Sequence, residues 1–313
     1  MTGNQLTMLI IDDDERYVDA LFRDCQRSGI HLCHARSLEE GRGLHEGQEG
    51  RQISGVILDV ECYRTSHDET PNSSFIIAAT KYFTEKAPDL PLVAITGVQP
   101  LFERFQKDFS GIWQVYRKGR DETEMLNWLK GRAERLEWVK IVRRYPDIFR
   151  IVDEHLGGEA RADLLDCLMY MDDVSLPRIR GNLANLRSIQ EKIYLTLHRL
   201  RPDMVPRQSV VFSDGNGSVQ SVNVAQILDH LKGNFDPNSR QVKGPVFLHY
   251  RSVMYRFSEL IYRVASDGIH AIDQDAASKP TRYTVQTVAF ALLDLIVWFG
   301  GIVEKQGNEE RSL

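Results

Sequence analysis

The sequence predicts an α/β fold, a five-stranded doubly wound parallel sheet, followed by a mainly α-helical domain with a β-hairpin. Two observations lead to this prediction. Short apolar runs alternate five times with helical patterns before residue 130, which is typical of a parallel sheet with helices on both faces. After Pro146 the periodicity is almost entirely helical. A chain of 313 residues has room for about two domains of ordinary size.

The strands of the sheet are expected where short apolar runs end at a polar residue. The five runs span residues 6–11, 31–35, 55–60, 92–96 and 112–117. The first and third are strongly apolar, as expected for central strands that are buried on both faces. These two runs should therefore form the middle of the sheet.

Helical patterns follow the strands, and the last of them is unusually long. The earlier helices are expected near residues 17–22, 38–45, 74–85 and 101–107. The last pattern predicts one helix from Asp121 to Arg144, because its apolar stripe continues from Leu126 to Val142. A capping box formed by Asp121 and Glu124 should open it, and Tyr145-Pro146 should end it. This helix could carry a signal or a dimer contact, or its stripe could simply pack on its own sheet.

Three segments are expected from these patterns: a sheet domain at 1–130, a linker helix at 131–145 that continues its last helix, and a mainly helical effector domain at 146–313. Helical periodicity in the last segment covers residues 146–156, 159–171, 175–201, 222–233, 245–266 and 282–305. A hairpin is expected where residues 209–213 and 218–222 flank an Asp-Gly-Asn-Gly turn.

The charge balance argues against a nucleic-acid target. Residues 141–313 contain 21 basic and 21 acidic groups, which leaves 18 and 23 in residues 1–140. A nucleic-acid-binding domain usually presents a basic face, so nucleic acid is not expected as a partner. Four cysteines without CxxC spacing and an N-terminus unlike a signal peptide predict a cytoplasmic protein. Residues 285–303 contain Asp294 and are expected to form a buried helix rather than a membrane span.

A specific set of polar residues stands at the carboxyl ends of the predicted strands. Asp12 and Asp13 follow the first strand, Asp59 the third, Thr96 the fourth and Lys118 the fifth. Because these strand ends meet at one edge of a parallel sheet, a site is expected there. Clustered carboxylates repel one another unless a divalent cation lies among them, and Mg²⁺ prefers oxygen ligands. The set predicts a carboxylate that attacks a phosphoryl group, with lysine neutralising the developing charge.

These residues resemble the receiver domain of two-component response regulators. The resemblance covers about residues 6–130 and rests on Leu9–Asp14, Val56–Asp59, Ala94–Gly97 and Tyr116–Lys118. A flavodoxin-like domain that kept the fold and lost the chemistry is the alternative, but the full set of site residues is present. The C-terminal half shows no such resemblance.

The resemblance implies a role for each residue of the site. Asp59 would form the aspartyl phosphate, Thr96 would be the switch hydroxyl and Lys118 would pair with the phosphoryl group. Magnesium is the implied cofactor, and its implied ligands are all oxygen donors: Asp12, Asp13, Asp59 and the backbone carbonyl of Glu61. The implied partner is a sensor histidine kinase or a phosphotransfer protein.

The sequence departs from the receiver pattern around this site. A long polar loop, Glu61–Ser73, follows the acceptor, and Glu61 should change the dephosphorylation rate. Gly119 follows the lysine where the pattern has proline, so a cis peptide is not expected there. The usual aromatic switch position is Val115, and the neighbouring Tyr116 should face the other side of the sheet. The structural response to phosphate at Asp59 is therefore expected to differ from the usual switch of receiver domains.

The C-terminal half contains isolated candidates but no catalytic signature. In the histidine phosphotransfer motif the lysine stands three residues after the histidine, whereas Lys232 stands two residues after His230. A surface histidine is therefore expected at His230. Arg263 and His270 are similar to the arginine–histidine pair of HEPN-type ribonucleases, although residues 266–268 resemble a helix end. Asp294 should have an arginine partner if it is buried. Whether this half is an enzyme therefore stays open, and only the receiver's own phosphorylation chemistry is expected.

The expected function is that of a cytoplasmic response regulator whose helical output domain binds an unidentified protein. A homodimer through the 121–144 helix is a further expected contact, and no membrane partner is expected. The alternative is a receiver-gated enzyme effector, either ribonuclease-like or nucleotide-acting. A DNA-binding output ranks below both, because the helical half is neutral.

Overall fold

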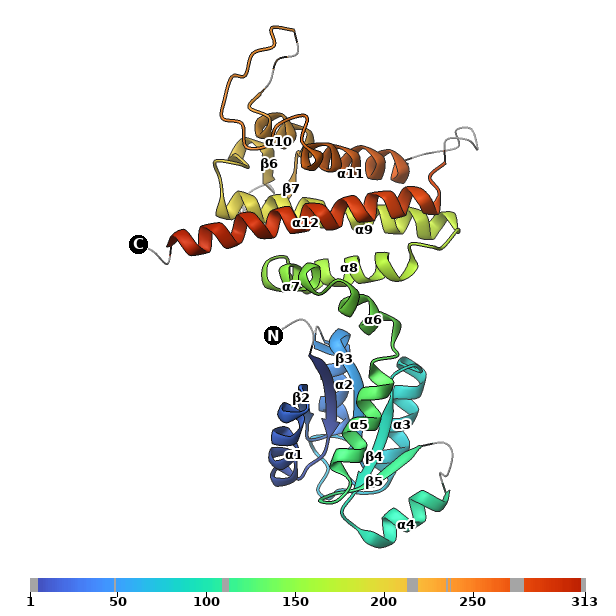
Figure 1. The fold of residues 1–313 in the computed structure, drawn as a ribbon. Helices are drawn as coiled ribbons and strands as arrows, with labels where there is room; N and C mark the ends of the chain where they lie inside the picture. Colours follow the sequence, from blue (N-terminus) through green and yellow to red (C-terminus); the bar gives the residue numbers. More distant parts are fainter. Residues whose placement is uncertain are drawn as a thin grey trace. The chain divides into compact units, whose positions relative to one another are not determined.

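The computed structural model describes residues 5–47, 49–108, 113–212, 219–234, 236, 238–270 and 279–310. The chain divides into two compact units, Met1–Arg144 and Tyr145–Leu313 (Figure 1). We call them the sheet unit and the helical unit and describe each by itself. All four cysteines are free thiols.

The sheet unit is built on a five-stranded parallel sheet in the order β2-β1-β3-β4-β5. Its strands are β1 (Leu6–Ile11), β2 (Ile30–Ala35), β3 (Ile53–Asp59), β4 (Leu92–Thr96) and β5 (Gln114–Arg117). Every residue of β1 and β3 is buried, as expected for strands covered on both faces. The predicted doubly wound parallel sheet is confirmed.

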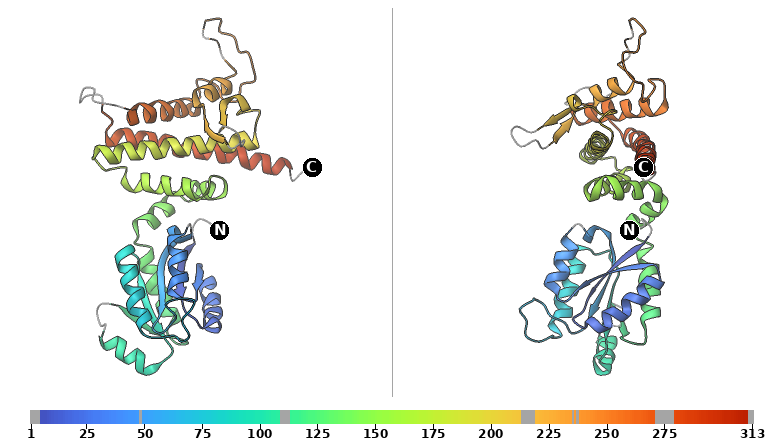
Figure 2. Two further views of the ribbon diagram at one scale, coloured as in Figure 1. Left: turned by 180° about the vertical axis from the view of Figure 1, so that it is seen from behind. Right: turned by 90° about the vertical axis from the view of Figure 1, so that its left-hand side faces the viewer.

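Helices cover both faces of this sheet (Figures 1 and 2). They are α1 (Glu15–Arg27), α2 (Leu38–Glu46), α3 (Ser74–Lys86), α4 (Gln99–Asp108) and α5 (Glu122–Ala133), with a short 3-10 helix at Glu49–Gln52. Side chains of α1 and α5 form one hydrophobic core with the sheet, and those of α2, α3 and α4 contribute to a second. Tyr116 belongs to the first core and Val115 packs on the second, so the two face opposite sides of the sheet.

The residues expected to form one helix from Asp121 to Arg144 form two. α5 ends at Ala133, and α6 (Glu137–Arg144) begins after a short turn. Val139 of α6 is buried in the same core as Leu126 and Leu129 of α5. The apolar stripe therefore packs on the sheet unit's own core, which was one of the two interpretations left open by the sequence.

The start of α5 also differs from the expected capping box. The Asp121 side chain makes no capping hydrogen bond to α5. Its carboxylate instead accepts hydrogen bonds from the backbone N–H of Arg117 at 2.9 Å and from the guanidinium of the same residue at 2.9 and 3.0 Å. A charged bidentate partner has displaced the weaker local cap, because charge-assisted pairs are about twice as strong as neutral hydrogen bonds.

The helical unit contains six α-helices and a small hairpin among its described residues. The helices are α7 (Pro146–His155), α8 (Gly157–Tyr170), α9 (Leu176–Leu200), α10 (Val224–Leu231), α11 (Val253–His270) and α12 (Arg282–Glu310). The strands β6 (Val210–Phe212) and β7 (Val219–Val222) are antiparallel and follow a 3-10 helix at Arg207–Ser209. The predicted helical domain with a hairpin is confirmed, while the expected Asp214–Gly217 turn lies outside the described residues.

Helix α12 is apolar enough to cross a membrane by length and composition alone. Within residues 282–305, the most apolar 18-residue window has a mean hydropathy of 1.8, and 56% of that window is buried inside the protein. Val285, Leu292, Ile296 and Phe299 are almost completely buried, and the helix packs against α9, α11 and α7. In this fold α12 is therefore a core helix of the helical unit.

Candidate functional site

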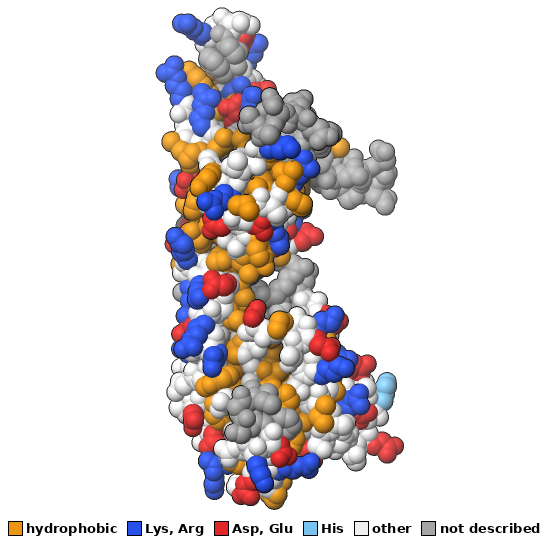
Figure 3. All heavy atoms as spheres, turned by 90° about the vertical axis from the view of Figure 1, so that its right-hand side faces the viewer, with side chains coloured by type: hydrophobic (Ala, Val, Ile, Leu, Met, Phe, Trp, Pro, Cys, Tyr) orange, Lys and Arg blue, Asp and Glu red, His pale blue; other side chains and the backbone are white. Residues whose placement is uncertain are grey.

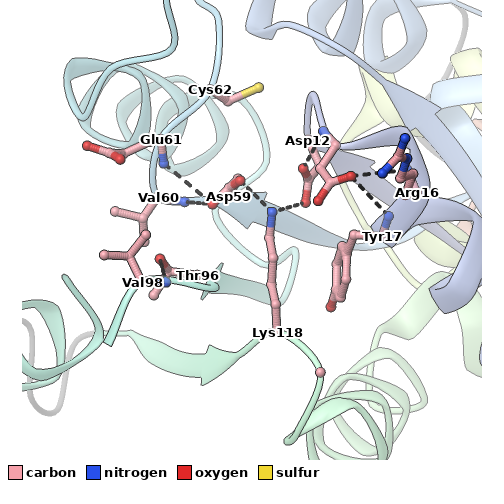
Figure 4. Close-up of polar contacts among 12 residues, drawn as sticks. Asp12, Arg16, Tyr17, Asp59, Val60, Glu61, Cys62, Thr96, Val98 and Lys118 are labelled. Atoms are coloured by element: carbon pink, nitrogen blue, oxygen red, sulfur yellow. Dashed lines mark hydrogen bonds and ion pairs between the residues drawn. The ribbon is translucent and has the colours of Figure 1, made fainter. Parts of the chain in front are cut away.

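The predicted site residues come together at the carboxyl edge of the sheet (Figure 4). Asp12 directly follows β1, and Asp59 is the last residue of β3. In the sheet register Asp59 is paired with Ile95, so Thr96 lies one residue farther along the neighbouring strand. Lys118 follows β5 and reaches across this edge toward both aspartates.

The ammonium group of Lys118 bridges two carboxylates. Its Nζ atom lies 2.6 Å from Asp59 Oδ2 and 2.7 Å from Asp12 Oδ2. The side chains of Asp12, Asp59 and Lys118 are only 0%, 12% and 13% exposed. A paired cation is required here, because a buried carboxylate without one loses its hydration without compensation.

Backbone hydrogen bonds hold the two carboxylates in place. Oδ1 of Asp12 accepts a hydrogen bond from the N–H of Asp14 at 2.9 Å. Oδ1 of Asp59 accepts one from the N–H of Val60 at 2.6 Å. Each aspartate therefore has one oxygen bound to the backbone and another bound to Lys118, which fixes the direction in which both carboxylates point.

The site carries more negative charge than Lys118 can balance. Burial, together with the charge of Asp12, raises the pKa of Asp59 to about 7 despite the opposing effect of Lys118. Burial also raises the pKa of Asp12. Burial alone would lower the pKa of Lys118, but the charges of Asp59 and Asp12 outweigh it and raise that pKa. The ammonium therefore stays charged while the carboxylates remain short of positive charge.

Three aspartates at this edge fit a divalent cation. One carboxylate oxygen from each of Asp12, Asp13 and Asp59 lies within 4.8 Å of the others. An all-oxygen donor set with surplus negative charge is what Mg²⁺ prefers, and a bound cation would relieve the raised pKa of Asp59. The contribution of the Glu61 carbonyl stays a prediction. The carboxylate of Glu61 points away from Asp59 in Figure 4.

Thr96 and the residues after Lys118 complete the edge. Thr96 is 2% exposed, and its hydroxyl oxygen accepts a hydrogen bond from the N–H of Val98 at 3.2 Å. That oxygen keeps its own proton available for donation. Gly119 has a φ of +77°, a conformation that glycine adopts readily, and no cis peptide bond occurs among the described residues.

The long loop after Asp59 is anchored to the start of α2. Tyr63 pairs with Ser37 in an isolated parallel bridge, and the carbonyl of Tyr63 accepts a hydrogen bond from Leu38 at 3.0 Å. The Glu39 carboxylate accepts hydrogen bonds from the backbone N–H and the hydroxyl of Ser66, both at 3.1 Å. Loop and helix border an open hollow of about 610 Å³ that is lined in part by Arg36 and Tyr63. These contacts therefore hold the loop in a defined position, and the loop begins at Glu61, two residues after the acceptor Asp59.

Sequence reasoning missed Tyr17 as a site residue. Its periodicity placed it on the core-facing side of the first helix, and the ring does pack against the first core. The structure also places the centre of that ring 4.9 Å from Lys118 Nζ. The available signal was position, because Tyr17 lies in the first helical turn after the acidic residues of the site.

The candidates in the helical unit lie on three different helices, and only Arg263 and His270 share one, α11. The ring of His230 is 2.8 Å from the backbone carbonyl of Asp203, as suits a structural histidine. Arg263 pairs with Glu259 at 3.0 Å. Helix α11 continues through the expected end at residues 266–268 and reaches His270, whose side chain lies outside the described residues. Asp294 is exposed, so the expectation of a buried ion pair there does not apply.

Comparisons with known proteins give distant similarities. No protein-family model matches the chain. No curated protein matches it. The N-terminal domain of a response regulator receiver protein from Methanoculleus marisnigri JR1 is 18% identical, with a TM-score of 0.26, over 40% of this chain and 94% of that one. A structure described as adenylate cyclase from Rhodopirellula baltica is 14% identical, with a TM-score of 0.32, over 47% and 98% of the two chains.

The sheet unit itself fits a receiver domain. A five-stranded parallel sheet in the order β2-β1-β3-β4-β5 has helices on both faces. The acidic cluster and Lys118 lie together at the carboxyl edge of that sheet, where ligands of doubly wound folds bind. Fold and placement of the cluster agree with the resemblance found in the sequence.

Proposed function

We propose that this protein is a response regulator that accepts a phosphoryl group on Asp59. The observation that carries this proposal is the bridge from Lys118 to both Asp12 and Asp59 at the edge of a parallel sheet. In this bridge the nucleophilic carboxylate of Asp59 lies beside the Lys118 ammonium, which can then pair with the negative charge of the transferred phosphoryl group. A bound Mg²⁺ would keep Asp59 ionised and neutralise the phosphoryl oxygens, with Asp12, Asp13, Asp59 and the Glu61 carbonyl as its proposed ligands.

In the proposed reaction, a carboxylate oxygen of Asp59 attacks the phosphorus of a phosphohistidine on the partner kinase or phosphotransfer protein. The new O–P bond forms as the N–P bond breaks, and the electron pair of that bond stays with the histidine ring. Lys118 then pairs with a phosphoryl oxygen rather than with Asp59. Thr96 donates its hydroxyl proton to another phosphoryl oxygen.

The helical unit is the proposed output, and its proposed target is a protein. Residues 141–313 are electrically neutral. On the face in Figure 3, basic and acidic side chains are interspersed with hydrophobic ones. Phosphorylation changes this output only if the phosphorylated sheet unit favours one arrangement by a definite free energy. The proposed location is the cytoplasm.

A receiver-gated ribonuclease is a second candidate, supported by the length of α11. Because the helix continues to His270, Arg263 and His270 stand seven residues apart on one helix, which puts them on the same side after two turns. Incubation of the full chain with RNA tests this candidate. Cleavage that disappears in both Arg263→Ala and His270→Ala would replace the protein-binding output with an enzymatic one.

Phosphoryl incorporation tests the proposed function. The full chain should gain one phosphoryl group from acetyl phosphate and Mg²⁺, as measured by intact-protein mass spectrometry, and Asp59→Asn should gain none. Asp19→Asn is the matched control, because Asp19 is an exposed carboxylate on α1. A wild-type chain that stays unmodified with acetyl phosphate and with its cognate kinase would overturn the proposal.

A further inference from the structure

The side chain of Tyr17 lies against Lys118, at the edge where Asp12 and Asp59 meet. The first turn of α1 is fixed by Asp14, whose carboxylate accepts hydrogen bonds from the N–H groups of Arg16 at 3.1 Å and Tyr17 at 3.2 Å. This cap sets the backbone of Tyr17 next to the acidic residues. The ring then extends along the lysine side chain, as Figure 4 shows.

The ammonium group of Lys118 therefore has three neighbours of two kinds. Two are carboxylates, Asp59 at 2.6 Å and Asp12 at 2.7 Å. The third is the ring of Tyr17, with its centre 4.9 Å from Nζ, within the range of a cation–π interaction. The carboxylates are also the proposed cation ligands, whereas the ring cannot bind Mg²⁺. Mg²⁺ would therefore compete with Lys118 for the two carboxylates but not for the ring.

The hydroxyl group of Tyr17 does not explain its position. Its oxygen is buried, and the charged group closest to it in effect is the carboxylate of Glu122. Burial, with the nearby charge of Glu122, raises the pKa of Tyr17, so the phenol is neutral. Burying a hydroxyl costs free energy, and the contacts of the ring with the first core and with Lys118 offset that cost.

We propose that Tyr17 is a positioning residue whose ring holds the Lys118 ammonium at the phosphoryl-transfer edge. This inference rests on the proposed function of Asp59. When the carboxylates take up a cation, Lys118 loses part of its pairing with them, and the ring keeps the ammonium close to the acceptor. The ring thus favours the arrangement in which Lys118 is ready to pair with the incoming phosphoryl group.

Two substitutions separate the ring from the hydroxyl. Tyr17→Phe keeps the ring and removes the hydroxyl, so its phosphorylation rate with acetyl phosphate and Mg²⁺ should stay within about twofold of the wild type. Tyr17→Leu removes the ring and should slow phosphorylation by about 5- to 30-fold, as expected for a partly desolvated cation–π contact. Leu21→Val is the packing control, because Leu21 is 1% exposed in the same core and on the same helix.

A second measurement needs neither metal nor phosphodonor. In NMR spectra of the cation-free protein, the ring should shift the Lys118 side-chain ammonium and methylene signals upfield. This shift should persist in Tyr17→Phe and Leu21→Val and disappear in Tyr17→Leu. A wild-type rate in folded Tyr17→Leu, or an equal slowing in Leu21→Val, would overturn the inference. If the wild-type chain takes up no phosphoryl group at all, the proposed function fails, and an unchanged Lys118 signal in Tyr17→Leu would overturn the ring contact separately.

Discussion

A buried charge is balanced by a single partner in the helical unit, whereas the buried charges of the sheet unit are not balanced. In the helical unit, the buried Arg161 is balanced by one partner, Asp153, at 2.8 Å, and its guanidinium lies over the ring of Phe149. In the sheet unit, one lysine serves two buried aspartates, and a third aspartate lies next to them. A balanced pair stabilises one arrangement, whereas an unbalanced cluster has capacity for another cation. This difference favours the sheet unit as the place of the proposed phosphoryl-transfer chemistry.

The largest effect is expected from removing Lys118, the only positively charged side chain among the described residues that pairs with Asp12 and Asp59. Lys118→Ala should slow phosphorylation from acetyl phosphate by about 10²- to 10³-fold, because a charged group aimed at the developing phosphoryl charge is lost. The affinity for Mg²⁺, measured by calorimetric titration, should not fall, since the lysine no longer competes for Asp12 and Asp59. A parallel loss of Mg²⁺ affinity would mean that Lys118 only maintains the fold.

Substitutions in the Arg161–Asp153 pair of the helical unit should change the free energy of unfolding. Arg161→Met leaves Asp153 without its partner and should lower the free energy of unfolding by about 2–4 kcal/mol in urea denaturation. The double variant Arg161→Met/Asp153→Leu should recover most of this loss, because no unpaired charge remains. Phosphoryl incorporation at Asp59 should be unchanged in both. An equal loss in the single and double variants would show that packing, not charge pairing, dominates there.

The unbalanced cluster predicts a pH dependence with the opposite sign to that of an ordinary salt-bridged carboxylate. The pKa of Asp59 is raised to about 7 in the folded state, against about 3.9 in an unfolded chain. The folded protein therefore binds an extra proton between these values. In the cation-free protein, stability from this group is present at acid pH and is lost as the pH rises toward 7.

Asp59→Asn should remove this dependence. In EDTA at pH 8, the variant should be more stable than the wild type by roughly 1–3 kcal/mol, and the difference should shrink toward pH 4. Saturating Mg²⁺ should also reduce the difference, because the cation offsets the same charge. Thermal unfolding across this pH series provides the measurement. A wild type that becomes more stable relative to the variant between pH 4 and 7 would contradict the charge imbalance.

The smallest effect is expected at a neutral polar contact inside the helical unit. The side-chain amide of Gln190 donates hydrogen bonds to the backbone carbonyl and the hydroxyl of Ser258 at 2.8 and 2.9 Å, while its own Oε1 has no partner among the described residues. Gln190→Leu loses those bonds but also removes the unpartnered oxygen. The free energy of unfolding in urea should therefore change by no more than about 1 kcal/mol. A loss above that range would indicate a polar network that acts as a unit.

Much of the sheet unit was predictable because its strands are short, apolar and end at polar residues. That pattern located Asp12, Asp13, Asp59, Thr96 and Lys118 before any geometry was known. The break between α5 and α6 was not predictable, since the apolar stripe keeps its helical spacing across the turn. Periodicity reports which residues face the core and does not report where the backbone bends.

Other differences come from competition between partners. The carboxylate of Asp121 pairs with Arg117, four residues before it, instead of capping α5, and the sequence allows both arrangements. Helix α11 continues through Gly268 because a single glycine costs only about 1 kcal/mol inside a helix. Tyr17 satisfied the helical pattern as a core residue, so its second contact, with Lys118, became visible only in three dimensions.

Stabilisation by a phosphoryl mimic tests the central claim most directly. Mg²⁺ together with beryllofluoride should raise the midpoint of thermal unfolding of the wild-type chain, because Mg²⁺ would supply the positive charge that the carboxylates lack and the beryllofluoride anion would then bind an oxygen of Asp59 as a phosphoryl group does. Asp59→Asn should show no additional shift from beryllofluoride. A wild-type chain that responds to neither ligand, or an Asp59→Asn variant that responds to beryllofluoride as strongly as the wild type, would contradict the assignment of Asp59.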